Sequence, residues 1–159
     1  DIGLARLPVL RRLDEVRVVS LADERLWVAM PDGHPLAARA SLALAELASE
    51  PFVSALHRER GGLARRVTDL CLQRGFVPRM AAAISRKTSM LALVGAGFGL
   101  AVIPACMRGM APVGVCTRPL ADGDAMAEAA ILLPAEPSPL ARRFSDVCQE
   151  AWKDEVGCV

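Results

Sequence analysis

The segment from Lys87 to Pro104 constrains the fold of this chain most, because it reads as one helix–turn–strand unit. Thr88 or Ser89 can cap the start of the helix, since a short side-chain oxygen accepts a hydrogen bond from an unpaired amide of the first turn. The glycines that begin at Gly95 supply the backbone freedom that ends a helix. Residues 100–103 form an unbroken apolar run, which predicts a strand covered on both faces by helices.

The run G-A-G-F-G at 95–99 has the look of a nucleotide-binding loop. A dinucleotide fingerprint, however, follows a strand and opens a helix. Here the glycines follow the predicted helix and open the strand, so the order is reversed. We therefore interpret them as a helix end and predict no nucleotide and no other cofactor.

Strands and helices alternate along the rest of the chain, which predicts an α/β fold with a mainly parallel sheet. Residues 16–21 and 26–30 are expected as two strands separated by a turn at 22–24. A helix that Gly61 and Gly62 open is expected to bury one apolar stripe, and so is a C-terminal helix that Ser138 caps. The first stripe consists of Leu63, Val67, Leu70 and Cys71, and the second of Leu140, Phe144, Val147, Cys148, Ala151 and Trp152.

Composition excludes some classes of function. The 19 basic and 18 acidic side chains give a net charge of +1, whereas a free-standing nucleic-acid-binding domain usually has a basic excess. No segment approaches the roughly 20 apolar residues of a membrane span. The five cysteines are scattered and odd in number, and the two histidines lack metal-ligand spacing, so neither a disulfide scaffold nor a metal site is expected. Reduced thiols and a cytoplasmic location follow as expectations.

Six segments, in this order and spacing, resemble the effector-binding (regulatory) domain of LysR-type transcriptional regulators. They are D-I-G-L-A-R at 1–6, E-R-L-W-V-A-M-P-D-G-H-P-L-A at 24–37, L-A-E-L-A-S-E-P-F-V at 44–53, L-C-L-Q-R-G-F-V-P at 70–78, L-A-L-V-G-A-G-F-G-L-A-V-I-P at 91–104 and G-V-C-T-R-P-L at 114–120. The resemblance covers nearly the whole chain.

This resemblance implies a two-lobed fold similar to type 2 periplasmic binding proteins, with an effector cleft between the lobes. Residues 1–29 and 121–159 would form an incomplete lobe I, and residues 30–120 would form lobe II. The domain would sense a small-molecule effector, and DNA would be bound only through a winged helix-turn-helix that this chain lacks. A homo-oligomer is expected for the full-length protein. Apolar surface that the missing part of lobe I would cover is expected to favour association.

The resemblance also places candidate effector contacts, and helix N-termini independently favour an anion there. Arg6, next to Ala5, could add a bidentate contact to a carboxylate from the facing lobe. The candidate ligand-binding residues are Arg6, Ser54, His57, Gly61, Gly62, Lys87, Thr88 and Ser89. A small carboxylate or similar anionic metabolite is the expected effector. Thr88 as a simple cap, and Arg6 as a surface-paired arginine, are the structural alternatives for these residues.

Two other functions fit parts of the pattern. A periplasmic-type solute-binding protein for a small carboxylate would share the fold. A hydrolase would use a serine with His57, but nucleophilic catalysis needs a base and an orienting acid within hydrogen-bond reach. The chain has no G-x-S-x-G elbow, and no partner for His57 is evident. The sequence therefore predicts a binding module with no catalytic residues rather than an enzyme.

Overall fold

The computed structural model describes residues 1–9, 14–55, 61–84 and 87–156. Its strands are β1 (Gly3–Arg6), β2 (Val16–Pro31), β3 (Pro51–Ala55), β4 (Arg79–Ile84), β5 (Ala101–Pro104), β6 (Val115–Pro119) and β7 (Met126–Pro134). Its α-helices are α1 (Leu63–Gln73), α2 (Lys87–Gly95) and α3 (Pro139–Val156). Short 3-10 helices are η1 (Pro35–Ala38), η2 (Leu44–Leu47) and η3 (Ala105–Met110). None of the described helices combines the length and the apolar character needed to cross a membrane.

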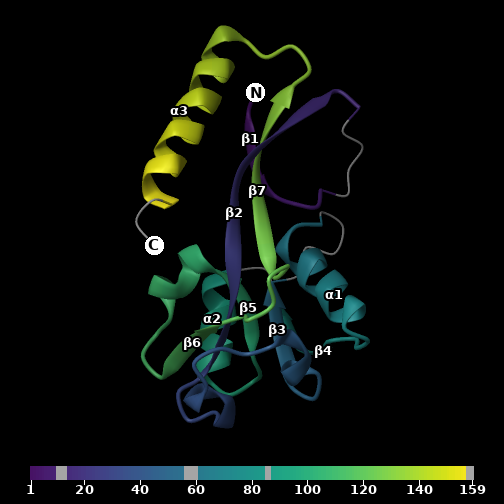
Figure 1. Cartoon of the computed structure of the whole chain (residues 1–159), viewed down its shortest axis with the longest axis vertical. Coiled ribbons are helices and arrows are strands. Elements are labelled where there is room, and N and C mark those ends of the chain that lie inside the picture. The colour runs from purple at the N-terminus through teal and green to yellow at the C-terminus, as the bar shows by residue number, and fades with distance from the viewer. Residues whose placement is uncertain (10–13, 56–60, 85–86, 157–159) are drawn as a thin grey trace.

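Strand β2 is the spine of the molecule, because it changes partners half-way along its length. Residues 16–25 pair with β7, whose other edge pairs with β1. From Leu26 onward, β2 pairs instead with β5 and β6. We call β1, β7, α3 and residues 16–25 of β2 the upper half, and residues 26–31 of β2 with η1 to β6 the lower half (Figure 1). The chain returns to the upper half through residues 120–126, which we call the crossing segment.

The lower half contains the parallel strands of the molecule. β3 and β4 pair in parallel, and a parallel bridge between Phe52 and Leu100 joins β3 to β5. The Leu100 amide donates to the Pro51 carbonyl oxygen at 2.8 Å, and the Val53 amide donates to the Leu100 carbonyl oxygen at 2.8 Å. Because β3, β4 and β5 run in the same direction, their carboxyl ends meet at one edge of the sheet.

The expectation of mainly parallel sheets is wrong for the described strands. β2 pairs antiparallel with β5, β6 and β7, and β7 pairs antiparallel with β1. The expected turn at residues 22–24 is also absent, since β2 continues through it with only a register shift between Ser20 and Ala22. The polar Glu24 stays in the strand because its carboxylate is paired inside the protein. Because this one long strand belongs to both halves, each half contains antiparallel pairs with it.

Helices cover both faces of the lower sheet, as the apolar run at 100–103 predicts. Alternate residues of β5 point to opposite faces. Leu100 and Val102 belong to a core cluster that contains Leu70 of α1, whereas Ala101 and Ile103 belong to a second cluster that contains α2 residues. The α1 stripe is confirmed, because Leu70 and Cys71 are buried and Leu63 and Val67 pack against the same cluster.

The helix–turn–strand unit is confirmed in its order. Helix α2 ends at Gly95, and the Phe98 and Gly97 amides donate to the carbonyl oxygens of Leu93 and Val94, at 3.1 and 2.9 Å. This pair of bonds is the Schellman pattern that satisfies the last carbonyls of a helix. The start of the helix differs from the expectation that Thr88 or Ser89 precedes it as the cap. Helix α2 already begins at Lys87, so Thr88 and Ser89 lie in its first turn.

Helix α3 forms where predicted but docks by only part of the expected stripe. Cys148 and Trp152 are half-buried, whereas Leu140, Phe144 and Val147 are 78%, 44% and 54% exposed and Ser145, outside the stripe, is buried. The helix lies beside β2 and turns a neighbouring face toward it, with the Gln149 side-chain amide 3.4 Å from the Ser20 carbonyl oxygen. Apolar side chains are thus exposed on α3, whereas a missing part of lobe I that would cover them, and the association that they would favour, stay predictions.

Candidate functional site

The carboxyl edge of the parallel strands is where the candidate residues gather. β3 ends at Ala55, β4 leads toward α2, and β5 leads directly into η3. In an open α/β sheet, ligands bind outside the carboxyl ends of the strands, because loops and helix N-termini meet there. This edge points toward the end of β1 in the upper half (Figure 1). The candidate site therefore lies where the two halves of the molecule meet.

Arg6 brings a positive charge to this region, and Glu24 of the same chain pairs with it. Its guanidinium forms an ion pair with the carboxylate of Glu24, which is 8% exposed. Arg6 also donates to the Ala127 carbonyl oxygen at 3.2 Å and lies 3.5 Å from the Cys106 sulfur. The other oxygen of Glu24 accepts the Cys106 backbone amide at 3.0 Å. A ligand carboxylate at Arg6 would therefore have to share the guanidinium with Glu24 or replace it.

The two glycines before α1 approach the upper half closely. Gly61 and Gly62 have φ values of 76° and 75°, a region that L-residues with a side chain rarely adopt. The Gly62 amide donates to the Pro8 carbonyl oxygen at 2.6 Å, and Gly61 bridges Val9. A Cβ on Gly62 would lie 3.5 Å from the Arg6 carbonyl oxygen. The Gly62 amide, which lies at a helix N-terminus that the sequence predicted to favour an anion, thus already has a partner within the chain.

The remaining candidates belong to β3 and α2. Ser54 is half-buried near the end of β3 and pairs with Ala83 of β4. Lys87, Thr88 and Ser89 form the first turn of α2, which packs against β3, and Ser89 is exposed. His57 lies outside the described residues. The structure thus places Arg6, Gly61 and Gly62 close together as one group. Ser54 lies apart from them, paired with β4, the strand that precedes α2.

Sequence reasoning missed two members of the first group. Glu24 was assigned to a turn, and Cys106 was considered only as a scattered thiol. Glu24 is 18 residues from Arg6 and 82 from Cys106, so no local spacing could bring the three together. One signal was available in the sequence. Glu24 alternates with apolar residues, so in a strand its side chain would point inward with theirs, and a buried carboxylate needs a cation as its partner.

The cysteines differ sharply in their surroundings. Cys71 is buried in α1, and burial raises the pKa of its thiol to about 11. Cys106 is exposed at the start of η3. Because the thiolate is the nucleophile, iodoacetamide at pH 8 is expected to alkylate Cys106 in the folded chain and to leave Cys71 unmodified. Peptide mass spectrometry measures both sites, with urea-unfolded protein as the control; equal rates at the two sites in folded protein would contradict the prediction.

The chemistry available at this edge is that of binding. It offers a guanidinium, a buried carboxylate, backbone groups and hydroxyls, and within the described ranges no three potential metal ligands cluster together. Charge-assisted hydrogen bonds of this kind select anionic or strongly polar small molecules.

The sequence matches the LysR substrate binding domain over residues 1–153. It is 32% identical over 146 residues to the uncharacterized HTH-type transcriptional regulator YnfL of Escherichia coli, covering 91% of this chain and 48% of that protein. The match covers between 34% and 51% of the length of these curated relatives. These relatives are transcriptional regulators, which supports a non-enzymatic regulator domain and not the alternative of a periplasmic-type solute-binding protein.

Solved structures give the same fold. The effector-binding domain of BenM with its effector benzoate superposes with a TM-score of 0.85 at 22% identity, covering 98% of this chain and 70% of that chain. The effector-binding domain of QuiR in complex with shikimate superposes with a TM-score of 0.80 at 19% identity, covering 95% and 72%. The expected α/β fold similar to type 2 periplasmic binding proteins is thus confirmed.

Proposed function

This chain belongs to the LysR substrate-binding domain family, and we propose that it senses a small carboxylate at the carboxyl edge of β3, β4 and β5. In the complete regulator, binding would alter the relation of the two halves and so control DNA binding by a separate helix-turn-helix part. The observation that carries the proposal is the meeting of three parallel strand ends with Arg6 at one edge. The benzoate and shikimate of the two structural neighbours, both carboxylates, support this class of ligand.

The proposed contacts are those predicted from the sequence: Arg6, Ser54, His57, Gly61, Gly62, Lys87, Thr88 and Ser89. Of these, the first turn of α2 is best suited to hold the carboxylate, because the unpaired amides and the dipole at a helix start favour an anion. Arg6 would contribute only after rearrangement with Glu24, since the two are already paired. The Gly62 amide would likewise have to leave the Pro8 carbonyl oxygen.

The wider setting is part of the same proposal. We assign residues 1–29 and 121–159 to lobe I and residues 30–120 to lobe II; the change of partners along β2, at Leu26, falls four residues before the proposed boundary. The relatives' role in transcription supports a cytoplasmic location. Homo-oligomerisation of the full-length regulator is also proposed, and the exposed apolar face of α3 is compatible with further protein contacts.

Sodium benzoate and sodium shikimate test the ligand class through thermal unfolding of this chain. A ligand that binds only the folded state adds about 2.7 kcal/mol of stability at a hundredfold excess over its dissociation constant. We expect one of the carboxylates to raise the melting temperature, whereas the neutral benzamide does not. The Thr88→Ala variant should lose this shift. Thr68→Ala, the same change on α1, where the hydroxyl donates to the Ala64 carbonyl oxygen, should keep it.

Two results would count against this proposal. A cooperative melt that no carboxylate shifts, in this chain and in the full-length regulator, would exclude the ligand class. A shift of equal size in Thr88→Ala and in the unmodified chain would place the ligand away from the start of α2.

A further inference from the structure

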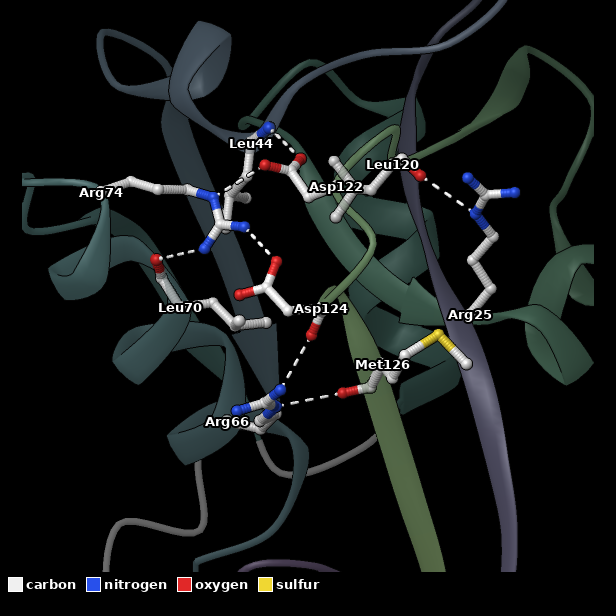
Figure 2. A network of polar contacts seen from close by, with 9 residues as sticks. All are labelled: Arg25, Leu44, Arg66, Leu70, Arg74, Leu120, Asp122, Asp124 and Met126. Atoms are coloured by element: carbon white, nitrogen blue, oxygen red, sulfur yellow. Dashed lines mark hydrogen bonds and ion pairs between the residues drawn. The ribbon is translucent and has the colours of Figure 1, made fainter.

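The crossing segment is held by two arginines, one at each end of α1. Arg66 lies in its first turn, Arg74 is the C-cap residue that follows Gln73, and both point toward residues 122–126, as Figure 2 shows. The Arg74 guanidinium donates to the Asp122 carboxylate at 2.8 Å and also pairs with the Asp124 carboxylate. Arg66 donates to the backbone oxygens of Asp124 and Met126, at 2.8 and 3.1 Å.

Further bonds make this contact rigid. The second oxygen of Asp122 accepts the Leu44 amide at 2.7 Å, which ties the crossing segment to η2 as well. Arg74 is anchored to its own helix through the Leu70 carbonyl oxygen at 3.1 Å. The side chains of Arg74 and Asp122 are 16% and 15% exposed, so solvent screens their interaction less than that of a surface pair. Hydrogen bonds from Arg74 also hold the pKa of Asp124 below its usual value.

The two ends of α1 both contact Asp124 but otherwise have different neighbours. Its first turn follows Gly62, whose amide is bound to Pro8 of the upper half, and contains Arg66. Met126, the acceptor for Arg66, is the first residue of β7. A displacement at the N-terminus of α1 thus reaches the start of β7 through the Arg66 side chain, in addition to the backbone contacts of Gly61 and Gly62 with Val9 and Pro8.

We propose that α1 and the crossing segment form one coupling unit, in which Arg66 transmits the position of the α1 N-terminus to β7 while Arg74 holds the far end of the helix fixed. This inference rests on the proposed function, because a ligand at the carboxyl edge would be what displaces the start of α1. Arg66 and Arg74 are positioning residues in this scheme: they act on the relation of the two halves and not on the ligand.

A double-mutant cycle read by hydrogen exchange tests the coupling without any ligand. Gly62→Ala perturbs the start of α1, because alanine resists a φ of 75° and its Cβ meets the Arg6 carbonyl oxygen at 3.5 Å. We expect this change to raise exchange of the crossing-segment and early β7 amides about tenfold, in the range of measured couplings between contacting residues. In the Arg66→Met background, the further increase caused by Gly62→Ala should disappear.

Arg65→Met is the matched control, because Arg65 is the neighbouring residue of α1 and its ion pair among the described residues runs along the helix to Asp69. In that background Gly62→Ala should retain its full effect. Arg66→Lys, which keeps the charge but loses the planar fork, serves as a second variant if Arg66→Met does not fold. Equal effects of Gly62→Ala in the unmodified, Arg65→Met and Arg66 backgrounds would overturn the proposal, and so would no effect in the unmodified chain.

The cycle is separable from the ligand-binding test. Loss of the carboxylate shift with an intact cycle would reject the proposed site and leave the mechanical coupling of α1 to β7. A carboxylate shift with an additive cycle would keep the site and reject Arg66 as its transmitter.

Discussion

The Gly99→Ala variant is expected to lose about 3 kcal/mol or more of unfolding free energy, because its side chain would meet the backbone of a neighbouring strand. Gly99 has a φ of 149°, in the region that glycine alone adopts easily. A Cβ there would lie 2.9 Å from the Pro51 carbonyl carbon and closer still to its oxygen. That same oxygen accepts the Leu100 amide, so moving it apart breaks the contact between β3 and β5.

Two other glycines serve as controls that distinguish the steric clash at Gly99 from the cost of a positive φ alone. Gly97 has a φ of 80° but open space where its Cβ would stand, so Gly97→Ala should cost only about 1–2 kcal/mol. Gly123 has open space and no positive φ, and Gly123→Ala should change stability little. Urea unfolding of the three variants gives the comparison. Equal stability of Gly99→Ala and Gly97→Ala would show that the backbone around Pro51 yields to the added carbon.

The order of helices and strands was predictable where residues close together in the sequence determine it. In the unit from Lys87 to Pro104, the end of α2 depends on glycines that are adjacent in sequence, and β5 on an unbroken apolar run. The α1 stripe was predictable for the same reason, since residues three and four apart share a helix face.

What could not be predicted depends on contacts between distant residues. The continuity of β2 through Glu24 needs Arg6, and the grip on the crossing segment needs Arg66 and Arg74 with Asp122 and Asp124, at separations of 48 to 60 residues. The antiparallel pairing of β5, β6 and β7 follows from the passage of β2 through both halves. No local sequence pattern predicts that passage. The orientation of α3 failed because helical periodicity identifies an apolar stripe but not the surface on which it packs.

Replacing Arg6 alone is expected to lower the free energy of unfolding much more than replacing Arg6 and Glu24 together. Arg6→Met should destabilise the chain by about 3 kcal/mol, because it leaves the Glu24 carboxylate buried without its cation. Arg6→Met combined with Glu24→Leu should recover to within about 1–2 kcal/mol of the unmodified chain, since apolar residues can replace a buried pair. The remainder reflects the Cys106 amide, which would lose its acceptor. Urea unfolding measures all members of the cycle, and additive effects would show that the pair carries no coupling.

The same pair determines whether Arg6 can serve a ligand. Glu24→Gln keeps an acceptor for the Cys106 amide but removes the charge that competes for the guanidinium. If Arg6 contacts the ligand, sodium benzoate or shikimate should bind Glu24→Gln more tightly than the unmodified chain, by about tenfold for each 1.4 kcal/mol gained. Adding Arg6→Met should remove that gain, and isothermal titration measures both. Equal affinities in all three proteins would assign Arg6 and Glu24 to holding the two halves together, and would leave the carboxylate to the first turn of α2.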